Sequence, residues 1–237
     1  CNRKTKLKVL FISDIHLGSK GSQSKKLLEV LKDETPDKLF IVGDFIDGWL
    51  LKKRWFWKQT ETNVVRKILS YTKKGVEVIW VTGNHDDFMR QFTPIQFGEN
   101  FKVVDEIVWN DYLVTHGDLY DGVVKLKWLG KLGAFGYETA IGIDTFLRKF
   151  GCKRSLSSFL KQKVKRAVKF MTTFEKQLGY QAIQNNCKGV ICGHIHRPTE
   201  KWMEVQNQKI HYLNCGDWLE HNSYILFEDG KFSLISK

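Results

Sequence analysis

Short apolar runs that end in polar residues recur along this chain. The first three such runs cover residues 7–12, 39–42 and 76–82. Between them, apolar residues return every three or four positions over 24–32 and 60–73, which predicts two amphipathic helices. Strands that alternate with helices are typical of βαβ units, so this part of the chain predicts a largely parallel sheet.

The later pattern is different. Residues 101–115 predict two strands joined by a turn at Asn110-Asp111, which would make the sheet mixed. The spacing over 123–178 is helical, and strands resume after Gly189, with a turn at Asp229-Gly230. No repeat or low-complexity linker interrupts the chain. We therefore predict one domain over 1–237 that carries a helical cap insertion at about 123–178.

Positive charge is concentrated in that insertion. The chain has a net charge of +12. Between Thr145 and Phe174 there is no acidic residue, and the basic ones are Arg148, Lys149, Lys153, Arg154, Lys161, Lys163, Lys165, Arg166 and Lys169. This predicts an anionic partner for the cap. A second basic segment, 49–58, holds three tryptophans and four basic residues in a predicted loop or short helix, which we interpret as packing or as a dimer contact.

Composition narrows the class of protein. Apolar residues make up 42% of the chain and aromatic residues 13%, which excludes a disordered chain. No apolar run approaches the ~20 residues of a membrane-spanning helix. The five cysteines are scattered and show no Cys-x-x-Cys spacing, which favours reduced thiols. Because no signal-peptide pattern is seen either, we expect a cytoplasmic location.

Five apolar runs end in residues that bind metals. These ends are Asp14-Ile15-His16, Asp44 in GDFID, Asn84-His85 in GNHD, His116 in THGD, and His194-Ile195-His196 in GHIH. Each motif alone is weak evidence, because a single motif of this kind is more often a capped turn than a metal ligand. Because the carboxyl ends of parallel strands meet at one edge of a sheet, the five together predict a metal centre there.

The residue types suit two divalent ions that share a carboxylate. Asp14, His16, Asp44 and one of His194 and His196 form a ligand set for the first ion. Asp44, Asn84, His116 and the other terminal histidine form a set for the second. Mixed nitrogen and oxygen ligation favours Mn²⁺, with Fe²⁺ or Zn²⁺ as alternatives, over Ca²⁺.

The order DIH, GDFID, GNHD, THGD and GHIH resembles the calcineurin-like metallophosphoesterases. The resemblance implies an α/β fold, a four-layer αββα sandwich of mixed sheets, with two metals at the sheet edge. It assigns His194 to the second metal and His196 to the first. It also implies a dimetal-dependent phosphohydrolase in which a hydroxide that bridges the metals cleaves a phosphoester or pyrophosphate bond.

The same resemblance assigns two catalytic residues. His85 would stabilise the developing charge or protonate the leaving oxygen, and Asp47 would orient His85. For Asp47 the alternative is a helix N-cap or turn residue. Asp86 and Asp118 are candidates for supporting positions around the metals, or for ordinary turn residues.

Within the superfamily, GDFIDGW, the insertion after THGDLYDG and the segment LNCGDWLEHNS are similar to the UDP-2,3-diacylglucosamine pyrophosphatases of lipid A synthesis. In that family the insertion forms a lid over a groove that holds acyl chains. This implies a UDP-2,3-diacylglucosamine-like or other lipid- or nucleotide-linked pyrophosphate as substrate. It also implies peripheral contact of the basic cap with the anionic inner membrane. The plain alternative is an amphipathic helix that only packs on the core.

Other functions stay open at this point. The lipid A enzymes usually carry arginine at the position of His85, whereas histidine is the general superfamily pattern for phosphomonoesters and diesters. A nuclease or cyclic-nucleotide phosphodiesterase, with nucleic acid on the basic cap, is therefore the alternative, although no nucleic-acid module is recognisable. A non-catalytic scaffold is more remote because every ligand position is filled. A protein phosphatase would have arginine after GDxxD, where this chain has Gly48-Trp49. The oligomeric state is left open.

Overall fold

The computed structural model describes residues 7–121 and 156–237 of the chain. The chain divides into two compact units, one of Cys1–Asp118 with Leu178–Lys237 and the other of Leu119–Gln177. The predicted cap at about 123–178 falls largely on 122–155, outside the described residues. The division into one domain with a cap therefore stays a prediction.

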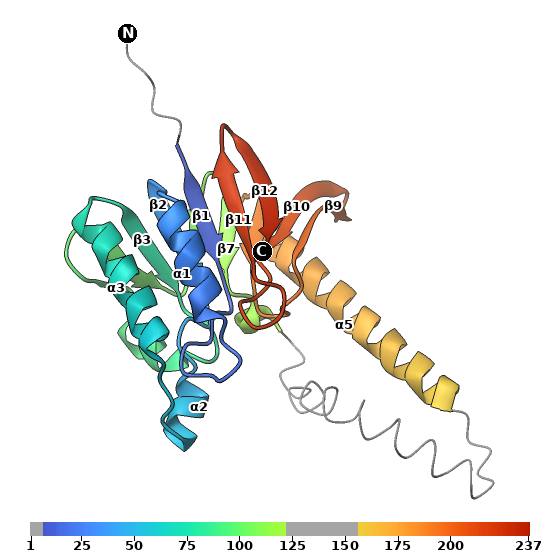
Figure 1. Ribbon diagram of the computed structural model, residues 1–237. Coiled ribbons are helices and arrows are strands. Elements are labelled where there is room, and N and C mark those ends of the chain that lie inside the picture. The colour runs from blue at the N-terminus through green and yellow to red at the C-terminus, as the bar shows by residue number, and fades with distance from the viewer. Residues whose placement is uncertain (1–6, 122–155) are drawn as a thin grey trace, which may run out of the picture. The chain divides into compact units, whose positions relative to one another are not determined.

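The first sheet has seven strands in the order β12-β11-β1-β2-β3-β5-β4 (Figure 1). Its strands are β1 (Val9–Ile12), β2 (Lys38–Val42), β3 (Glu77–Val81), β4 (Ile95–Gln96), β5 (Phe101–Val104), β11 (Ser223–Glu228) and β12 (Lys231–Ser236). The four strands β1, β2, β3 and β5 are parallel, and antiparallel strands complete both edges. The predicted parallel core and the turn at Asp229-Gly230 are thus present, and the sheet is mixed.

The second sheet has five strands in the order β6-β7-β8-β10-β9. Its strands are β6 (Glu106–Trp109), β7 (Tyr112–Thr115), β8 (Gly189–Cys192), β9 (Thr199–Val205) and β10 (Gln208–Asn214). β7, β8 and β10 are parallel, whereas β6 and β9 pair antiparallel at the edges.

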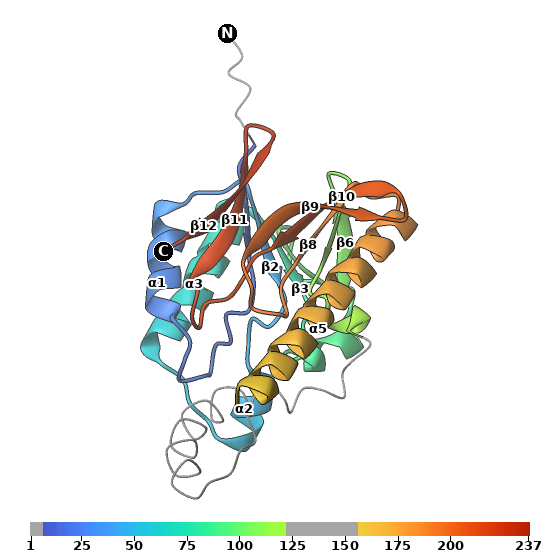
Figure 2. The ribbon, with the colours of Figure 1, turned by 90° about the vertical axis from the view of Figure 1, so that its right-hand side faces the viewer.

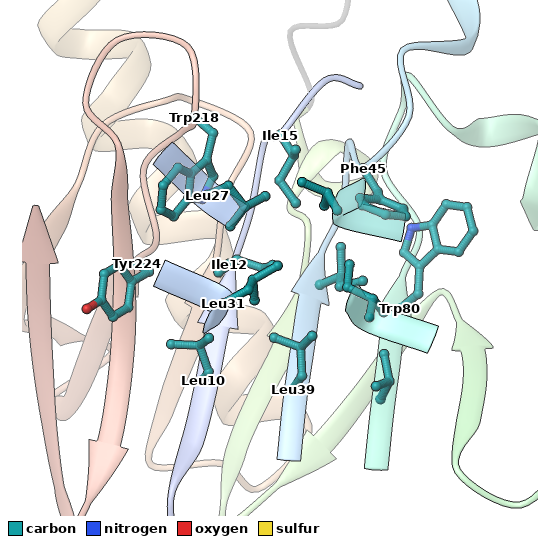
Figure 3. Close-up of a cluster of buried hydrophobic side chains, with 14 of the residues drawn as sticks. Leu10, Ile12, Ile15, Leu27, Leu31, Leu39, Phe45, Trp80, Trp218 and Tyr224 are labelled. Carbon is teal, nitrogen blue, oxygen red and sulfur yellow. The ribbon is translucent and has the colours of Figure 1, made fainter. Parts of the chain in front are cut away.

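Alternate residues of the central strands enter two different cores. Leu10, Leu39 and Val78 point toward α1 (Ser24–Asp33) and α3 (Gln59–Lys73), which cover one face of the first sheet. Figure 3 shows this core, with Leu27 and Leu31 of α1 above the strands. The residues that alternate with them along the same strands point the other way and form the core that lies between the two sheets. There Phe11 stacks on Phe40, with ring centroids 4.7 Å apart.

The last turns of α5 (Leu156–Gln184) cover the second sheet. Leu178 and Ala182 are fully buried. Gly179 lies against β9 so closely that a Cβ there would be 2.7 Å from Met203 and 2.8 Å from Val205. Together with α1, α3 and the two sheets, this gives the four layers αββα (Figure 2). The helix runs six residues beyond the predicted end at Leu178.

The prediction of two strands over 101–115 is wrong in number and placement. The segment forms three strands, and β5 joins the first sheet while the β6–β7 hairpin joins the second. The chain changes sheets at Asp105, whose carboxylate accepts hydrogen bonds from the hydroxyls of Thr82 (2.7 Å) and Thr93 (2.8 Å). The turn at Asn110-Asp111 is present, and both residues have left-handed φ.

Three shorter helices complete the described chain: α2 (Gly48–Lys53) and the 3₁₀ helices η1 (Asp87–Phe92) and η2 (Asp118–Tyr120). The cysteines that the structure describes, Cys187, Cys192 and Cys215, are buried and form no disulfide with one another. Over 7–121 and 156–237, none of the helices combines the length and the apolar character that a membrane span requires.

Candidate metal centre

The carboxyl ends of β1, β2 and β3 meet those of β7 and β8. Backbone hydrogen bonds join the loops that follow these strands. Asp14 N–H donates to the carbonyl of Gly43 (3.1 Å), and Gly193 N–H donates to that of His116 (3.2 Å). Between the sheets, the N–H of His194 donates to Oδ2 of Asp14 (3.0 Å). The ligand residues predicted on both sheets are therefore brought together.

Five of the predicted ligands have a left-handed backbone. They are Asp14 (φ 51°), His16 (50°), Asp44 (51°), His194 (70°) and His196 (53°). Such conformations cost on the order of 1 kcal/mol or more each and persist where the surroundings enforce them. Their concentration at one sheet edge is typical of a functional site.

Asp14, His16 and His196 form one group of potential ligands. Nε2 of His196 lies 3.0 Å from Oδ1 of Asp14 and 3.3 Å from Nε2 of His16. Nε2 of His16 is 3.9 Å from the same Oδ1. One ligand atom from each residue lies within 4.8 Å of the others. Two imidazoles and a carboxylate thus converge on one point.

Asp44 lies between this group and a second one. Its Oδ2 is 3.7 Å from Nε2 of His16 and 3.4 Å from Nε2 of His116. The His194 ring packs edge-on against His116, with centroids 5.2 Å apart. The side chain of Asn84 is buried after β3, at the same edge. The position of Asp44 suits a carboxylate that is shared by two cations.

Electrostatics tie the carboxylates to the histidines. Burial acts to raise the pKa of Asp14, but the charges of His196 and His116 outweigh it and lower this pKa to about 2. Burial opposes ionisation of Asp44 too, yet His116 and His16 hold its pKa well below the ordinary value. Burial acts to lower the pKa values of His196 and His116, but the nearby carboxylates outweigh it. They raise the pKa of His196 to about 9 and that of His116 well above its ordinary range. A cation that binds here therefore displaces protons.

Asp47 contacts both His85, the predicted catalytic residue, and His16, a predicted metal ligand. It is the N-cap of α2, where its Oδ1 accepts a hydrogen bond from Leu50 N–H (2.9 Å). The same oxygen lies 3.0 Å from Nδ1 of His85, and Oδ2 lies 3.5 Å from Nδ1 of His16. Burial acts to raise the pKa of Asp47, but His16 and His85 lower it below its ordinary range. Both roles considered for Asp47, helix cap and partner of His85, are thus compatible with one geometry.

Asp86 supports the loops that carry Asp44 and Asn84. Its buried carboxylate accepts hydrogen bonds from Phe45 N–H (2.8 Å), Trp80 Nε1–H (3.0 Å) and Gly83 N–H. Burial and the nearby charge of Asp44 raise its pKa to about 6. Asp86 thus belongs to the support around the site.

Asp118, the other candidate for such a role, forms a two-pronged ion pair with Arg90, at 2.8 Å for each contact. Arg90 also donates to the carbonyl of Thr82 (3.2 Å). This pair ties η2 to η1 and, through Thr82, to the end of β3.

Two residues beside the site, Ser13 and Trp49, are not among the ligands that the motifs predict. The Ser13 hydroxyl contacts Oδ2 of Asp14 and donates to the carbonyl of Val42 (2.9 Å). The Trp49 ring lies over His85, with centroids 4.3 Å apart and planes inclined by 32°. We interpreted the tryptophans of 49–58 as packing or as a dimer contact, but which ring Trp49 would contact depends on the fold.

The donor set fits divalent cations. Imidazole nitrogens and carboxylates converge, and the buried amide of Asn84 follows β3 at the same edge, a donor set that suits Mn²⁺, Fe²⁺ or Zn²⁺. Oδ1 of Asn84 is buried and accepts no hydrogen bond from any residue of 7–121 or 156–237, so a cation would satisfy it. Asp14, His16, Asp44 and His196 would hold one ion, and Asp44, Asn84, His116 and His194 the other.

The fold and the site define the class of protein. A family model described as calcineurin-like phosphoesterase matches residues 7–198. The chain belongs to this family, and its members' dependence on divalent metal ions agrees with the ligand groups described above.

Curated relatives span nearly the whole chain. A UDP-2,3-diacylglucosamine hydrolase of Neisseria gonorrhoeae is 28% identical over 258 residues, which cover 93% of this chain and 93% of that protein. A protein of the same name from Aliivibrio fischeri is 22% identical over 241 residues, covering 97% of this chain and 98% of its own. Family and relatives together make the chain a metal-dependent hydrolase.

Solved structures with similar folds include a phosphoesterase from E. coli, Yfce. It is 17% identical, with a TM-score of 0.49 over 97% of this chain and 92% of that chain. An archaeal phosphodiesterase is 14% identical, with a TM-score of 0.43 over 98% of this chain and 100% of its own.

Proposed function

We propose that this chain hydrolyses the pyrophosphate bond of UDP-2,3-diacylglucosamine or of a closely related lipid-linked nucleotide. The observation that carries the proposal is the match to proteins named for that substrate over nearly their full length. The match also covers the segments that follow the ligand motifs. Enzymes that share one fold differ in such segments, and these differences determine which substrate each enzyme binds.

The chain's own residues supply positioning and a proton. Bound cations would neutralise the charge of the pyrophosphate and activate water, with Mn²⁺ as our first choice. Asp47 holds Nδ1 of His85, which leaves Nε2 of that ring for the substrate. His85 then donates a proton to the leaving phosphate oxygen or stabilises its charge. The Trp49 ring covers His85 and restricts its rotation.

The second unit has features that suit a lipid. A hollow of about 400 Å³ is lined mainly by the apolar and aromatic side chains of Leu119, Tyr120, Phe170 and Phe174. An acyl chain would bury its methylenes in such a hollow. Lys165 and Lys169 of the basic stretch are exposed, which supports contact of the cap with an anionic membrane. We propose that this contact occurs on the cytoplasmic side of the inner membrane.

The test compares two substrates. Wild-type protein loaded with Mn²⁺ is incubated with UDP-2,3-diacylglucosamine and with bis-p-nitrophenyl phosphate, beside the Asp44→Ala variant. We expect release of UMP by the wild type and none by the variant, because Asp44 is common to both ligand sets. Metal content is measured by mass spectrometry, with Zn²⁺ and Fe²⁺ loading as comparisons.

Cleavage of the diester without UMP release would overturn the substrate assignment. That result would favour a diesterase, the alternative that a histidine at position 85 supports. Cyclic nucleotides and single-stranded nucleic acids would then be the next substrates to measure. Activity that persists in Asp44→Ala would overturn the metal-dependent mechanism itself.

A further inference from the structure

The outward side of α2 and of the residues after it is both basic and apolar. Its exposed side chains are Leu50, Lys52, Lys53, Arg54 and Trp55, called here the 50–55 surface. Trp55 is 74% exposed and Leu50 41%. No acidic residue occurs between Gly48 and Thr60. Three adjacent cations beside an exposed indole and an exposed leucine form a surface that suits an anionic partner with an apolar part.

The inward side of the same segment is anchored. Leu51 packs so closely on Gly18 that a Cβ there would lie 2.8 Å from its side chain. Trp57 packs on the core beneath α3 and donates from Nε1 to the hydroxyl of Thr62 (2.9 Å). The residues of the 50–55 surface are therefore held on a fixed base.

The 50–55 surface is close to the metal centre. α2 begins directly after Asp47, the carboxylate that contacts His16 and His85. In Figures 1 and 2, α2 lies beyond the carboxyl ends of β1, β2 and β3, the edge at which the ligands gather. Whatever binds this surface is thus brought next to the reaction site.

The chemistry favours a lipid surface over other partners. Tryptophan is enriched at the boundary between headgroups and acyl chains, and lysine and arginine beside it attract anionic headgroups. An exposed leucine gains free energy from acyl chains and nothing from a phosphate backbone. One face of Trp55 is also stacked on Trp57, with centroids 6.1 Å apart, so both faces are not available to bases.

We propose that the 50–55 surface docks on an anionic bilayer and brings the metal centre to the membrane surface. This contact is separate from that of the basic cap, and it places the metal centre beside lipid headgroups. It rests on the proposed function only for the identity of the substrate, because docking itself involves no hydrolysis.

The test measures sedimentation of the full chain with vesicles. One vesicle type is phosphatidylcholine alone, and the other contains phosphatidylcholine and phosphatidylglycerol in equal parts. The triple variant Lys52→Glu/Lys53→Glu/Arg54→Glu is compared with Lys25→Glu/Lys26→Glu/Lys32→Glu, which makes the same charge change on exposed lysines of α1. Trp55→Ala is compared with Trp202→Ala, an exposed tryptophan on β9. Thermal unfolding of each variant checks its fold.

We expect the wild type to bind the anionic vesicles in preference to the neutral ones. A basic side chain near such a surface contributes roughly fivefold in partitioning, so the triple variant at 52–54 should lose on the order of a hundredfold. Trp55→Ala should lose roughly tenfold. The α1 triple variant and Trp202→Ala should each lose much less than their counterparts.

Three outcomes would overturn the proposal. These are a wild type that does not sediment with anionic vesicles, equal losses in the 52–54 and α1 variants, and binding of a labelled oligonucleotide without binding of vesicles. Because no substrate is present, failure of UMP release leaves this measurement unaffected, and failure of docking leaves the hydrolysis assay unaffected.

Discussion

His85 is held from two directions, by the carboxylate of Asp47 and by the ring of Trp49. If it transfers or stabilises charge in the reaction, His85→Ala should lower kcat by roughly 10²- to 10⁴-fold, with bound metal unchanged. Kinetics with bis-p-nitrophenyl phosphate and metal analysis test this. Full activity in this variant would contradict the role that we assign to His85.

Asp47 offers a way to separate capping from positioning. Asp47→Asn keeps an N-cap residue but removes the charge beside His85, whereas Asp47→Ala removes both. We expect both variants to lose activity, and only Asp47→Ala to lose about 1 kcal/mol of unfolding free energy. Metal content is the control, because Oδ2 of Asp47 also lies 3.5 Å from His16. Equal stability of the two variants would argue against the cap.

Asp217 supports a prediction about pH. Burial acts to raise its pKa, but hydrogen bonds from the backbone of Glu220 and from His221 outweigh burial and lower this pKa. A depressed folded-state pKa stabilises the protein above the unfolded value, near 3.9, and this contribution is lost as pH falls through the folded value. Asp217→Asn should therefore cost about 1 kcal/mol at pH 7. The difference from wild type should shrink as the pH falls below the unfolded value and vanish once the pH lies below the folded value.

The measurement is chemical denaturation of wild type and variant across that pH range. Asp33→Asn, at an exposed carboxylate of α1, is the matched control and should change little at any pH. A cost for Asp217→Asn that stays constant down to acid pH would show that charge is not its source.

At the scale of elements, helix packing on the first sheet supplies much of the stability. Leu27 of α1 is fully buried among the side chains shown in Figure 3, whereas Leu69 of α3 is 53% exposed. Leu27→Ala should cost about 2–5 kcal/mol, because it removes apolar contacts and leaves a cavity. Leu69→Ala should cost less than about 0.5 kcal/mol. Urea unfolding measures both, and similar losses would contradict the assigned packing.

Which segments form strands and helices was largely predictable from the sequence, but which strands pair with each other was not. The apolar runs at 39–42 and 76–82 become β2 and β3, because strands covered on both faces read as continuous apolar segments. Nothing in residues 101–115 indicates that β5 and β6 belong to different sheets. Pairing depends on contacts far along the chain, such as those that Asp105 makes with Thr82 and Thr93.

Some features of the metal centre were likewise predictable from the sequence, and others were not. Ligand types and their places at strand ends follow from local sequence, because parallel strands deliver their carboxyl ends to one edge. The left-handed backbone at Asp14, Asp44 and His196 does not follow, since neighbours from other strands enforce it. The contact of Trp49 with His85 likewise joins α2 to the loop after β3 and requires the fold.

At the scale of the whole molecule, the metal centre joins the two sheets. Asp14 and Asp44 follow strands of the first sheet, while His116, His194 and His196 follow strands of the second. A cation held by residues of both sheets binds the folded chain and not the unfolded one. It therefore stabilises the fold, by about 2.7 kcal/mol at a free concentration one hundred times its Kd.

Removal of metal with a chelator should accordingly lower the midpoint of thermal unfolding, by about 5 °C or more for each site that was nearly saturated. Added Mn²⁺ should restore it. Asp44→Asn is the informative comparison, because it weakens both ligand sets while it keeps the size of the side chain. Its midpoint should respond little to chelator or Mn²⁺. A midpoint that Mn²⁺ leaves unchanged in the wild type would mean that the two sheets are held together by their apolar core alone, with no contribution from the ions.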